Sequence, residues 1–184
     1  MATIGPRIRI YSSLRPHVVD TPQGLRWQKA DSGQPVTWNI DFSNYKLPFP
    51  RPAFENMVLA QTKKIMSVCS IILQKSTNHP DIIISFQTVD GLGGTLGFAY
   101  TPSKGTSMAV SGPLSGDIVL DNAETDMTLP NWAVIVRHEL THSCGVSEHD
   151  GGIADDLMDP YFNPNLSYDF GPYSLSELRK RYPV

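Results

Sequence analysis

The sequence has few cysteines, no long apolar run and no excess of basic residues. Its 184 residues include 2 cysteines, and 15 lysines and arginines stand against 18 aspartates and glutamates, which gives a net charge of −3. No apolar segment reaches the roughly 18 residues that a membrane-spanning helix needs, so no transmembrane span is expected. The charge balance argues against a nucleic-acid-binding surface. Two cysteines leave the redox compartment open, and residues 1–10 lack the apolar stretch of a signal peptide.

What the sequence does contain is typical of one globular domain. Hydrophobic residues make up 40% of the chain and charged residues 18%, which are ordinary proportions for a folded protein with a core. The 15 prolines and 14 glycines predict many turns and irregular loops. Prolines and a glycine interrupt residues 1–24, which we interpret as an irregular N-terminal tail or a pro-segment. Residues 25–184 are the expected domain.

Two periodicities of the apolar residues predict an α+β fold, with a mixed sheet and helices on one side of it. Runs of alternating or β-branched apolar residues predict strands at 35–42, 81–86, about 96–100 and about 116–120. Helical spacing predicts helices over about 52–75 and about 130–144. A short final helix is expected to open at Ser174 or Ser176 and to end near Tyr182.

The two cysteines fall within the predicted helices. Cys69 lies on the apolar face of the first helix together with Ile72, and Cys144 lies near the end of the second. Both positions suit a core, where free cysteine is common. We therefore expect two buried thiols in preference to a disulfide.

The second predicted helix carries the motif His138-Glu139-Leu140-Thr141-His142. Residues four apart share one face of a helix, so both histidines can bind a single zinc ion. Glu139 is rotated away from them and can reach a zinc-bound water without being a ligand. The opposite face of this helix is apolar and is expected to pack on the core, through Ala133, Val136, Leu140 and Cys144.

A catalytic zinc needs a third protein ligand and one open position for water. Gly145 permits a sharp turn after the helix, and His149 returns four residues later. Bound zinc lowers the pKa of its water from about 15.7 to about 7, so that Glu139 can take a proton from it and pass the proton to the leaving amine. An HExxH match can arise by chance, with the histidines as a surface pair. The glycine, the third histidine and a downstream Leu157-Met158-Asp159-Pro160 favour the zinc site.

These residues resemble the metzincin metallopeptidases, and most of all the matrixin branch, which reads HExxHxxGxxH followed by a methionine turn. The resemblance extends over most of residues 25–183, and it includes Trp27, the strands near 36–40, 81–86 and 96–100, the segment 116–124 and the final helix. It implies a twisted mixed sheet, an active-site helix, a second long helix, a Met-turn at Met158 and a C-terminal helix.

Two departures from the matrixin pattern affect the metal sites. Glu148 occupies the place of the third histidine, and His149 follows one residue later. We prefer His149 as the third ligand because one inserted residue explains the shift, and Glu148 is the alternative because carboxylates also bind zinc. The loop between Gly105 and Asp117 lacks the histidines that hold a second, structural zinc in matrixins, so we expect one zinc only.

The resemblance also implies residues that bind substrate and calcium. An extended substrate would pair with the edge strand at Leu96, Gly97, Phe98 and Ala99. The pocket for the residue after the cleaved bond would be lined by Val134, Pro160, Tyr161 and Phe162. Asp121 and Glu124 match carboxylates that hold Ca²⁺, although acidic turn residues are often merely solvated. The same two interpretations apply to Asp155 and Asp156.

The leading hypothesis is a zinc endopeptidase that acts on a peptide or protein substrate. One alternative is a catalytically impaired zinc-binding module of metzincin fold that binds a protein partner; another is a zinc hydrolase of non-peptide amides.

The cysteine-switch motif PRCGxPD is absent, and Arg15-Pro16-His17 is only faintly similar to it. His17 could be a fourth zinc ligand on this similarity, but we favour a solvated tail residue. The resemblance implies an extracellular location. The sequence does not indicate an oligomeric state.

Overall fold

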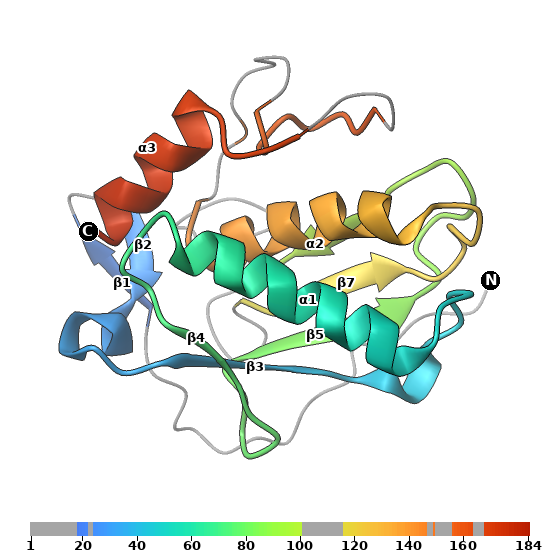
Figure 1. Ribbon diagram of the computed structural model, residues 1–184, viewed down its shortest axis with the longest axis horizontal. Coiled ribbons are helices and arrows are strands. Elements are labelled where there is room, and N and C mark those ends of the chain that lie inside the picture. The colour runs from blue at the N-terminus through green and yellow to red at the C-terminus, as the bar shows by residue number, and fades with distance from the viewer. Residues whose placement is uncertain (1–17, 22–23, 101–115, 147–148, 150–155, 164–167) are drawn as a thin grey trace.

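The computed structural model describes residues 18–21, 24–100, 116–146, 149, 156–163 and 168–184. Its strands are β1 (Val18–Thr21), β2 (Gly24–Trp27), β3 (Val36–Ile40), β4 (Leu73–Lys75), β5 (Ile82–Gln87), β6 (Gly97–Ala99) and β7 (Ile118–Asp121) (Figure 1). Its α-helices are α1 (Arg51–Met66), α2 (Leu129–Ser143) and α3 (Pro172–Arg181), and its 3-10 helices are η1 (Gln28–Ser32) and η2 (Phe42–Asn44).

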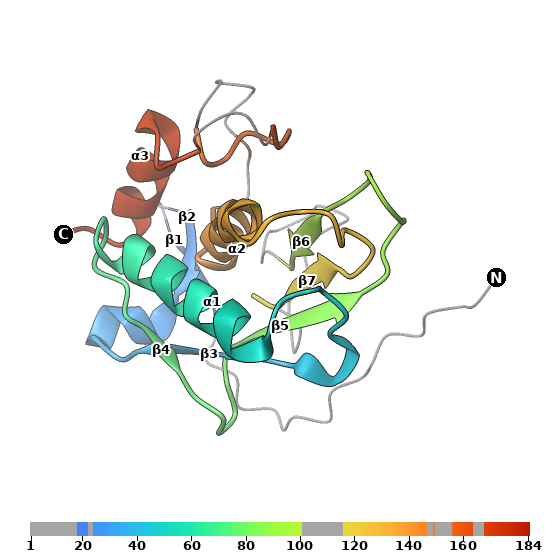
Figure 2. The ribbon, with the colours of Figure 1, turned by 45° about the vertical axis from the view of Figure 1, so that its right-hand side comes forward.

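The main sheet of the described residues has five strands in the order β4-β3-β5-β7-β6. Neighbouring strands are parallel except for β6, which runs antiparallel to β7 at the edge. The helices α1 and α2 contact each other and lie on the same face of this sheet (Figure 2). The predicted α+β class with a mixed sheet is therefore confirmed, and each predicted strand is found within two residues of its expected bounds.

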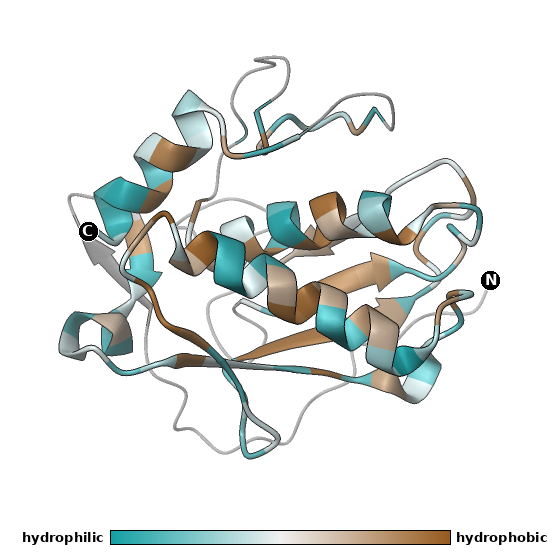
Figure 3. Ribbon diagram, viewed as in Figure 1, coloured by the Kyte–Doolittle hydropathy of each residue, from teal (hydrophilic) through white to brown (hydrophobic). Residues whose placement is uncertain are grey.

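The core lies between the sheet and these two helices. Four of the six residues of β5 are isoleucine or phenylalanine, and hydrophobic residues are concentrated along β5 and β7 (Figure 3). Large side chains that are fully buried come from every layer, among them Trp38, Phe54, Ile84, Trp132 and Leu140. Burying a side chain of this size contributes roughly 1.5–3 kcal/mol. Helix α2 is thus held against the sheet and α1 by its own apolar face.

The first long helix is shorter than predicted. It ends at Met66, and Cys69 and Ile72 lie beyond it in the connection to β4. The backbone of Ile72 accepts a hydrogen bond from Val36 N, and β4 then pairs with β3. This sheet pairing satisfies backbone groups that a longer helix would have used, so it overrides the helical spacing of the apolar residues. Ile72, expected on the buried face, is 43% exposed.

The predicted bounds of α2 are correct to within one residue, whereas α3 begins two residues before Ser174. Helix α2 starts after Thr128, whose hydroxyl accepts a hydrogen bond from Asn131 N. Helix α3 has no such cap of its own, because its first N–H groups donate to the carboxylate of Asp156. The cap comes from a residue that is distant in the sequence, and the local signal for this start is Pro172 at the first position of the helix.

The N-terminal part and the cysteines differ from expectation in position. Val18–Thr21, predicted to be irregular, is strand β1 and pairs antiparallel with β2. Residues 1–17, including His17, lie outside the described residues. Cys69 and Cys144 are both buried and not in a disulfide, as predicted, although neither lies inside a helix. No described helix is long and apolar enough to cross a membrane.

Candidate metal centre

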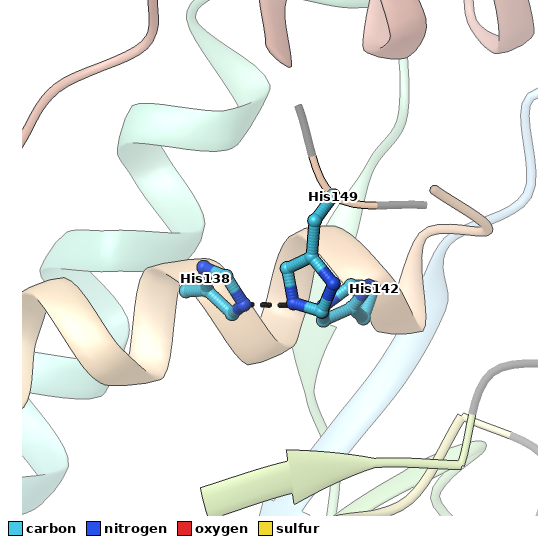
Figure 4. Close-up of side chains that lie close together, drawn as sticks. All are labelled: His138, His142 and His149. Atoms are coloured by element: carbon cyan, nitrogen blue, oxygen red, sulfur yellow. Dashed lines mark hydrogen bonds between the residues drawn. The ribbon is translucent and has the colours of Figure 1, made fainter. Parts of the chain in front are cut away.

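Three histidines converge above helix α2. His138 and His142 project from successive turns of the helix, and His149 approaches them from the segment that follows it (Figure 4). The ring centroid of His149 lies 5.3 Å from that of His138 and 5.0 Å from that of His142. One ligand nitrogen from each residue lies within 4.8 Å of the other two, so this cluster can hold a metal ion.

Hydrogen bonds fix the orientation of the two helix-borne rings. His138 Nδ1 lies 2.7 Å from the carbonyl oxygen of Leu157, and His142 Nδ1 lies 2.6 Å from that of Val146. A carbonyl can only accept, so each Nδ1 must donate its proton. Burial lowers the pKa of His138 to about 4 and that of His142 to about 3, so both rings are neutral near pH 7. Each ring therefore presents an unprotonated Nε2.

The two Nε2 atoms then face each other, 3.1 Å apart, with no proton between them. Two opposed lone pairs at this distance repel each other unless a cation lies beside both. The separation is close to the value of about 3.3 Å that two nitrogens have when they bind one tetrahedral zinc ion at about 2.0–2.1 Å. The donor set therefore fits a metal ion, and its nitrogen ligands suit Zn²⁺.

A tight turn after α2 brings Val146 back to His142. Gly145, at the centre of this turn, has φ +99°, a conformation that residues with a side chain rarely adopt. A Cβ atom there would also lie 2.0 Å from the carbonyl oxygen of Leu25 in β2. Gly145 is thus required both for the backbone conformation and for the close approach of β2.

Side chains that are distant in the sequence donate hydrogen bonds to carbonyl groups at the end of α2 and in the turn after it. Its last carbonyl groups have no partner within the helix. Trp27 Nε1 donates to the carbonyl of Ser143 at 2.8 Å, and the hydroxyl of Tyr182 donates to that of Cys144 at 2.8 Å. Arg181 Nε donates to the carbonyl of Gly145 at 3.0 Å. The sequence interpretation missed these roles, for which the only available signal is that buried tryptophan and tyrosine need polar partners.

The carbonyl that orients His138 belongs to the predicted Met-turn. Met158 is fully buried, and its backbone N–H donates to Asp156 Oδ1 at 3.1 Å. Asp156 Oδ2 accepts from the N–H groups of Tyr173 and Ser174 at 3.0 and 3.2 Å. Asp156 is therefore not a solvated turn residue as one interpretation had it. It joins the Met-turn to the start of α3. Asp155 lies outside the described residues.

Glu139 lies beside the histidines with one carboxylate oxygen unused. Its side chain is 5% exposed, and Oε2 has no hydrogen-bond partner. Burial raises the pKa of Glu139 to about 8, and a hydrogen bond from the backbone of Ala99 opposes that rise. A buried carboxylate with an unpartnered oxygen is costly, which indicates that a further group belongs at this position.

The histidines and Glu139 line an open cleft of about 1290 Å³. Strand β6 forms one side of it and the segment 157–162 the other, with α2 between them. Every residue predicted to bind substrate lines this cleft, namely Leu96, Gly97, Phe98, Ala99, Val134, Pro160, Tyr161 and Phe162. Among the described strands β6 pairs only with β7, and it forms the edge of the five-stranded sheet.

A buried polar chain that the sequence interpretation missed holds the wall at 161–163. Arg137, next to His138 and 3% exposed, donates to Gln61 Oε1 at 2.8 Å and to the carbonyl of Tyr168. The hydroxyl of Tyr168 donates to the carbonyl of Tyr161 at 2.8 Å and accepts from Asn163 N at 2.9 Å. The wall is therefore linked to α2 and, through Gln61, to α1.

The predicted calcium residues Asp121 and Glu124 are buried, so they are not simply solvated. Asp121 accepts hydrogen bonds from the backbone of Asp90 and Ala123, and Glu124 accepts one from Gly93 N at 2.5 Å. These bonds hold the glycine-containing loop between β5 and β6. Calcium binding by the two carboxylates stays a prediction, and Glu148, the alternative zinc ligand, lies outside the described residues.

No family model matches the chain, and no curated protein shows significant similarity to it. The assignment of a function therefore depends on the chemistry of the metal centre and its cleft.

Proposed function

We propose that this protein is a zinc-dependent endopeptidase of metzincin type, with a matrixin-like site. One observation carries the proposal. Three histidines with converging nitrogens and a buried carboxyl group with an unpartnered oxygen line the same cleft, beside the edge strand of the described sheet. Each feature is common by itself. Together they provide metal ligands, a general base and a place for an extended peptide.

The metal ligands would be His138, His142 and His149. Three neutral imidazoles with an open fourth position are the donor set of catalytic zinc sites. Zinc held in this way supplies a Lewis acid and lowers the pKa of a coordinated water to about 7. The carbonyls of Leu157 and Val146 keep two of the rings in the correct tautomer, as second-shell groups do in other zinc sites.

Glu139 would move the proton during hydrolysis, in the ionised form that the charge of a nearby zinc ion would favour by lowering its pKa. The oxygen of a water molecule attacks the peptide carbonyl carbon, and Glu139 Oε2 accepts the proton that the water loses. The C–N bond then breaks, and Glu139 returns this proton to the departing amine nitrogen. The products are a carboxylic acid and an amine, which become a carboxylate and an ammonium group when the acid passes its proton to the amine, and the carboxylate of Glu139 is regenerated. Its position beside His138 on the same helix places it next to the metal ligands without making it a ligand.

Strand β6 would align the substrate. An extended peptide can add to the edge strand β6 through backbone hydrogen bonds, which depend little on its sequence. The side chain that follows the cleaved bond would enter the part of the cleft lined by Val134, Phe162 and Tyr168. That region is mainly apolar, which favours an apolar side chain at this position.

Cleavage of peptides without free ends tests the proposal. We expect the purified protein to cut internal bonds in a library of acetylated and amidated peptides, to lose activity with a zinc chelator, and to regain activity when zinc is added. Cleavage that survives removal of all metal would contradict the proposal. One bound zinc without cleavage of any library member would favour the alternative, a zinc-binding module that has lost turnover.

A further inference from the structure

Four acidic residues line the cleft in addition to Glu139. They are Asp90, Glu124, Asp126 and Asp159, and no described lining residue is lysine or arginine. The whole chain contains 15 basic and 18 acidic residues, so its overall composition does not explain a lining of one sign. The negative charge is concentrated at the site where a substrate would bind.

These carboxylates reach the cleft from separate parts of the fold. Asp90 belongs to the β5–β6 connection, Glu124 and Asp126 to the β7–α2 connection, and Asp159 to the segment after Met158. No ion pair between described residues includes any of the four. Asp126 is exposed, and Asp159 is half-buried with one oxygen accepting from Tyr161 N. The charges of Asp126 and Asp159 are thus available to a bound molecule, whereas Glu124 is buried and both oxygens of Asp90 accept hydrogen bonds from Thr95.

A second observation also points to a ligand that carries hydrogen-bond donors or positive charge. The Oε2 atom of Glu139 is buried in the same cleft and has no partner. The other titratable groups among the described lining residues are the three histidines and the hydroxyls of Tyr161 and Tyr168. The two charges of one zinc ion would offset only half of the four acidic residues.

We propose that the cleft selects peptides with lysine or arginine close to the cleaved bond over peptides with glutamate or aspartate there. This inference rests on the proposed function, because it treats the cleft as a peptide-binding site. Opposite charges raise affinity and like charges lower it, and the effect decreases as salt increases. A calcium ion near Asp121 would offset the negative charges of Glu124 and Asp90. The test therefore changes Asp126 and Asp159.

Peptide binding, measured without cleavage, tests the inference. The protein is the zinc-loaded Glu139→Gln variant, and the probes are three fluorescent ten-residue capped peptides. They share one sequence except at two positions that flank a central Gly-Leu bond, where they carry lysine, glutamine or glutamate. At low salt we expect the lysine peptide to bind about tenfold more tightly than the glutamate peptide, and the ratio to decrease at about 0.5 M salt.

Two double variants show whether the acidic lining is the cause. Asp126→Asn with Asp159→Asn is expected to reduce the ratio to about threefold or less and to leave binding of the glutamine peptide unchanged. Asp31→Asn with Glu55→Gln changes the net charge equally at partly exposed positions that do not line the cleft, and should keep the tenfold ratio. Equal binding of the lysine and glutamate peptides, or a ratio that persists in the cleft variant, would overturn the inference.

Wild-type cleavage of the glutamine peptide separates this inference from the proposed function. Cleavage of that peptide without any charge preference in binding overturns only the inference. A clear lysine preference in binding, with no cleavage by the wild type, supports the inference and counts against the endopeptidase.

Discussion

The metal centre combines two regions of different character. His138 and His142 lie on a helix that packs on the core, and each ring is oriented by a backbone carbonyl. His149 has an exposed side chain and follows the turn that ends the helix. One region is a preformed pair of candidate ligands. The other supplies the third candidate from outside regular secondary structure.

The difference predicts how much each histidine contributes to zinc affinity. Ordering the helix pair costs little when metal binds, because folding has already fixed both rings. Holding His149 in place costs more, because its side chain is exposed. We therefore expect the pair to determine most of the zinc affinity, and His149 to complete the site.

The largest expected effect is the loss of zinc when one member of the pair is removed. His142→Ala should weaken zinc binding by on the order of 1000-fold and abolish cleavage. His149→Ala should weaken binding by about 10–100-fold, because the pair remains. Competition with a chromophoric chelator measures both affinities. Glu148→Ala is the matched control and should bind zinc like the wild type; zinc loss in that variant alone would make Glu148 the third ligand.

The next prediction concerns the turn that fixes His142. Gly145→Ala should lower the free energy of unfolding by at least about 3 kcal/mol, because the new Cβ would meet the Leu25 carbonyl at 2.0 Å in a backbone conformation that disfavours alanine. Gly33→Ala has a similar backbone conformation with open space around it, and should cost only about 1 kcal/mol. Urea denaturation measures both. Equal losses would show that the contact with Leu25 is unimportant.

Smaller losses of stability and zinc affinity are expected when Asp156, next to the carbonyl that orients His138, is changed. Asp156→Asn replaces one acceptor oxygen by an NH₂ group facing backbone N–H donors, so it should cost about 2 kcal/mol of stability. Because Leu157, which orients His138, lies next to Asp156, zinc affinity should also decrease, by about tenfold. Thermal unfolding and chelator competition give the two values. Unchanged zinc affinity in a destabilised variant would show that Asp156 supports the fold but not the ligand.

The metal-free protein should be most stable near pH 6.5. The pKa values of His138 and His142 are lowered by folding, so the unfolded chain binds more protons below about pH 6.5 and stability decreases as the pH falls toward about 4. The pKa of Glu139 is raised from 4.5 to about 8, so the folded state holds an extra proton between these pH values. This opposes the effect of the two histidines below about pH 6.5, and it makes stability decrease as the pH rises from about 6.5 to 8. Each slope should be about 1 kcal/mol per pH unit, measured by urea denaturation with a chelator present.

Glu139→Gln provides the control for this pH dependence. The variant should lose the decrease in stability between about pH 6.5 and 8 and keep the decrease on the acidic side. A wild-type stability that does not change over the upper range, or the same decrease in the variant, would contradict the assignment to Glu139.

The sequence predicted those features that depend on local spacing. The i, i+4 histidines, Gly145 and the isoleucine-rich strand at 82–87 follow from the periods of helices and strands, and the structure places them as expected. The sequence also placed the residues predicted to bind substrate, through a resemblance to matrixins, and all of them line one cleft.

Features that depend on distant contacts could not be predicted. The end of α1 is set by the pairing of β4 with β3, and the start of α3 by Asp156. The contacts of Trp27 and Tyr182 with the end of α2 join residues 116 and 38 positions apart. No local pattern records such contacts, because they depend on how the whole chain folds.

The central claim is that the histidine cluster holds a catalytic zinc that works together with Glu139. Zinc content and peptide cleavage, measured on the same preparations of wild type and Glu139→Gln, test it most directly. We predict one zinc per chain in both proteins, rapid cleavage by the wild type, and a rate lower by about 100-fold or more in the variant. Wild-type protein without zinc, or a zinc-loaded Glu139→Gln variant that cleaves at the wild-type rate, would contradict the account.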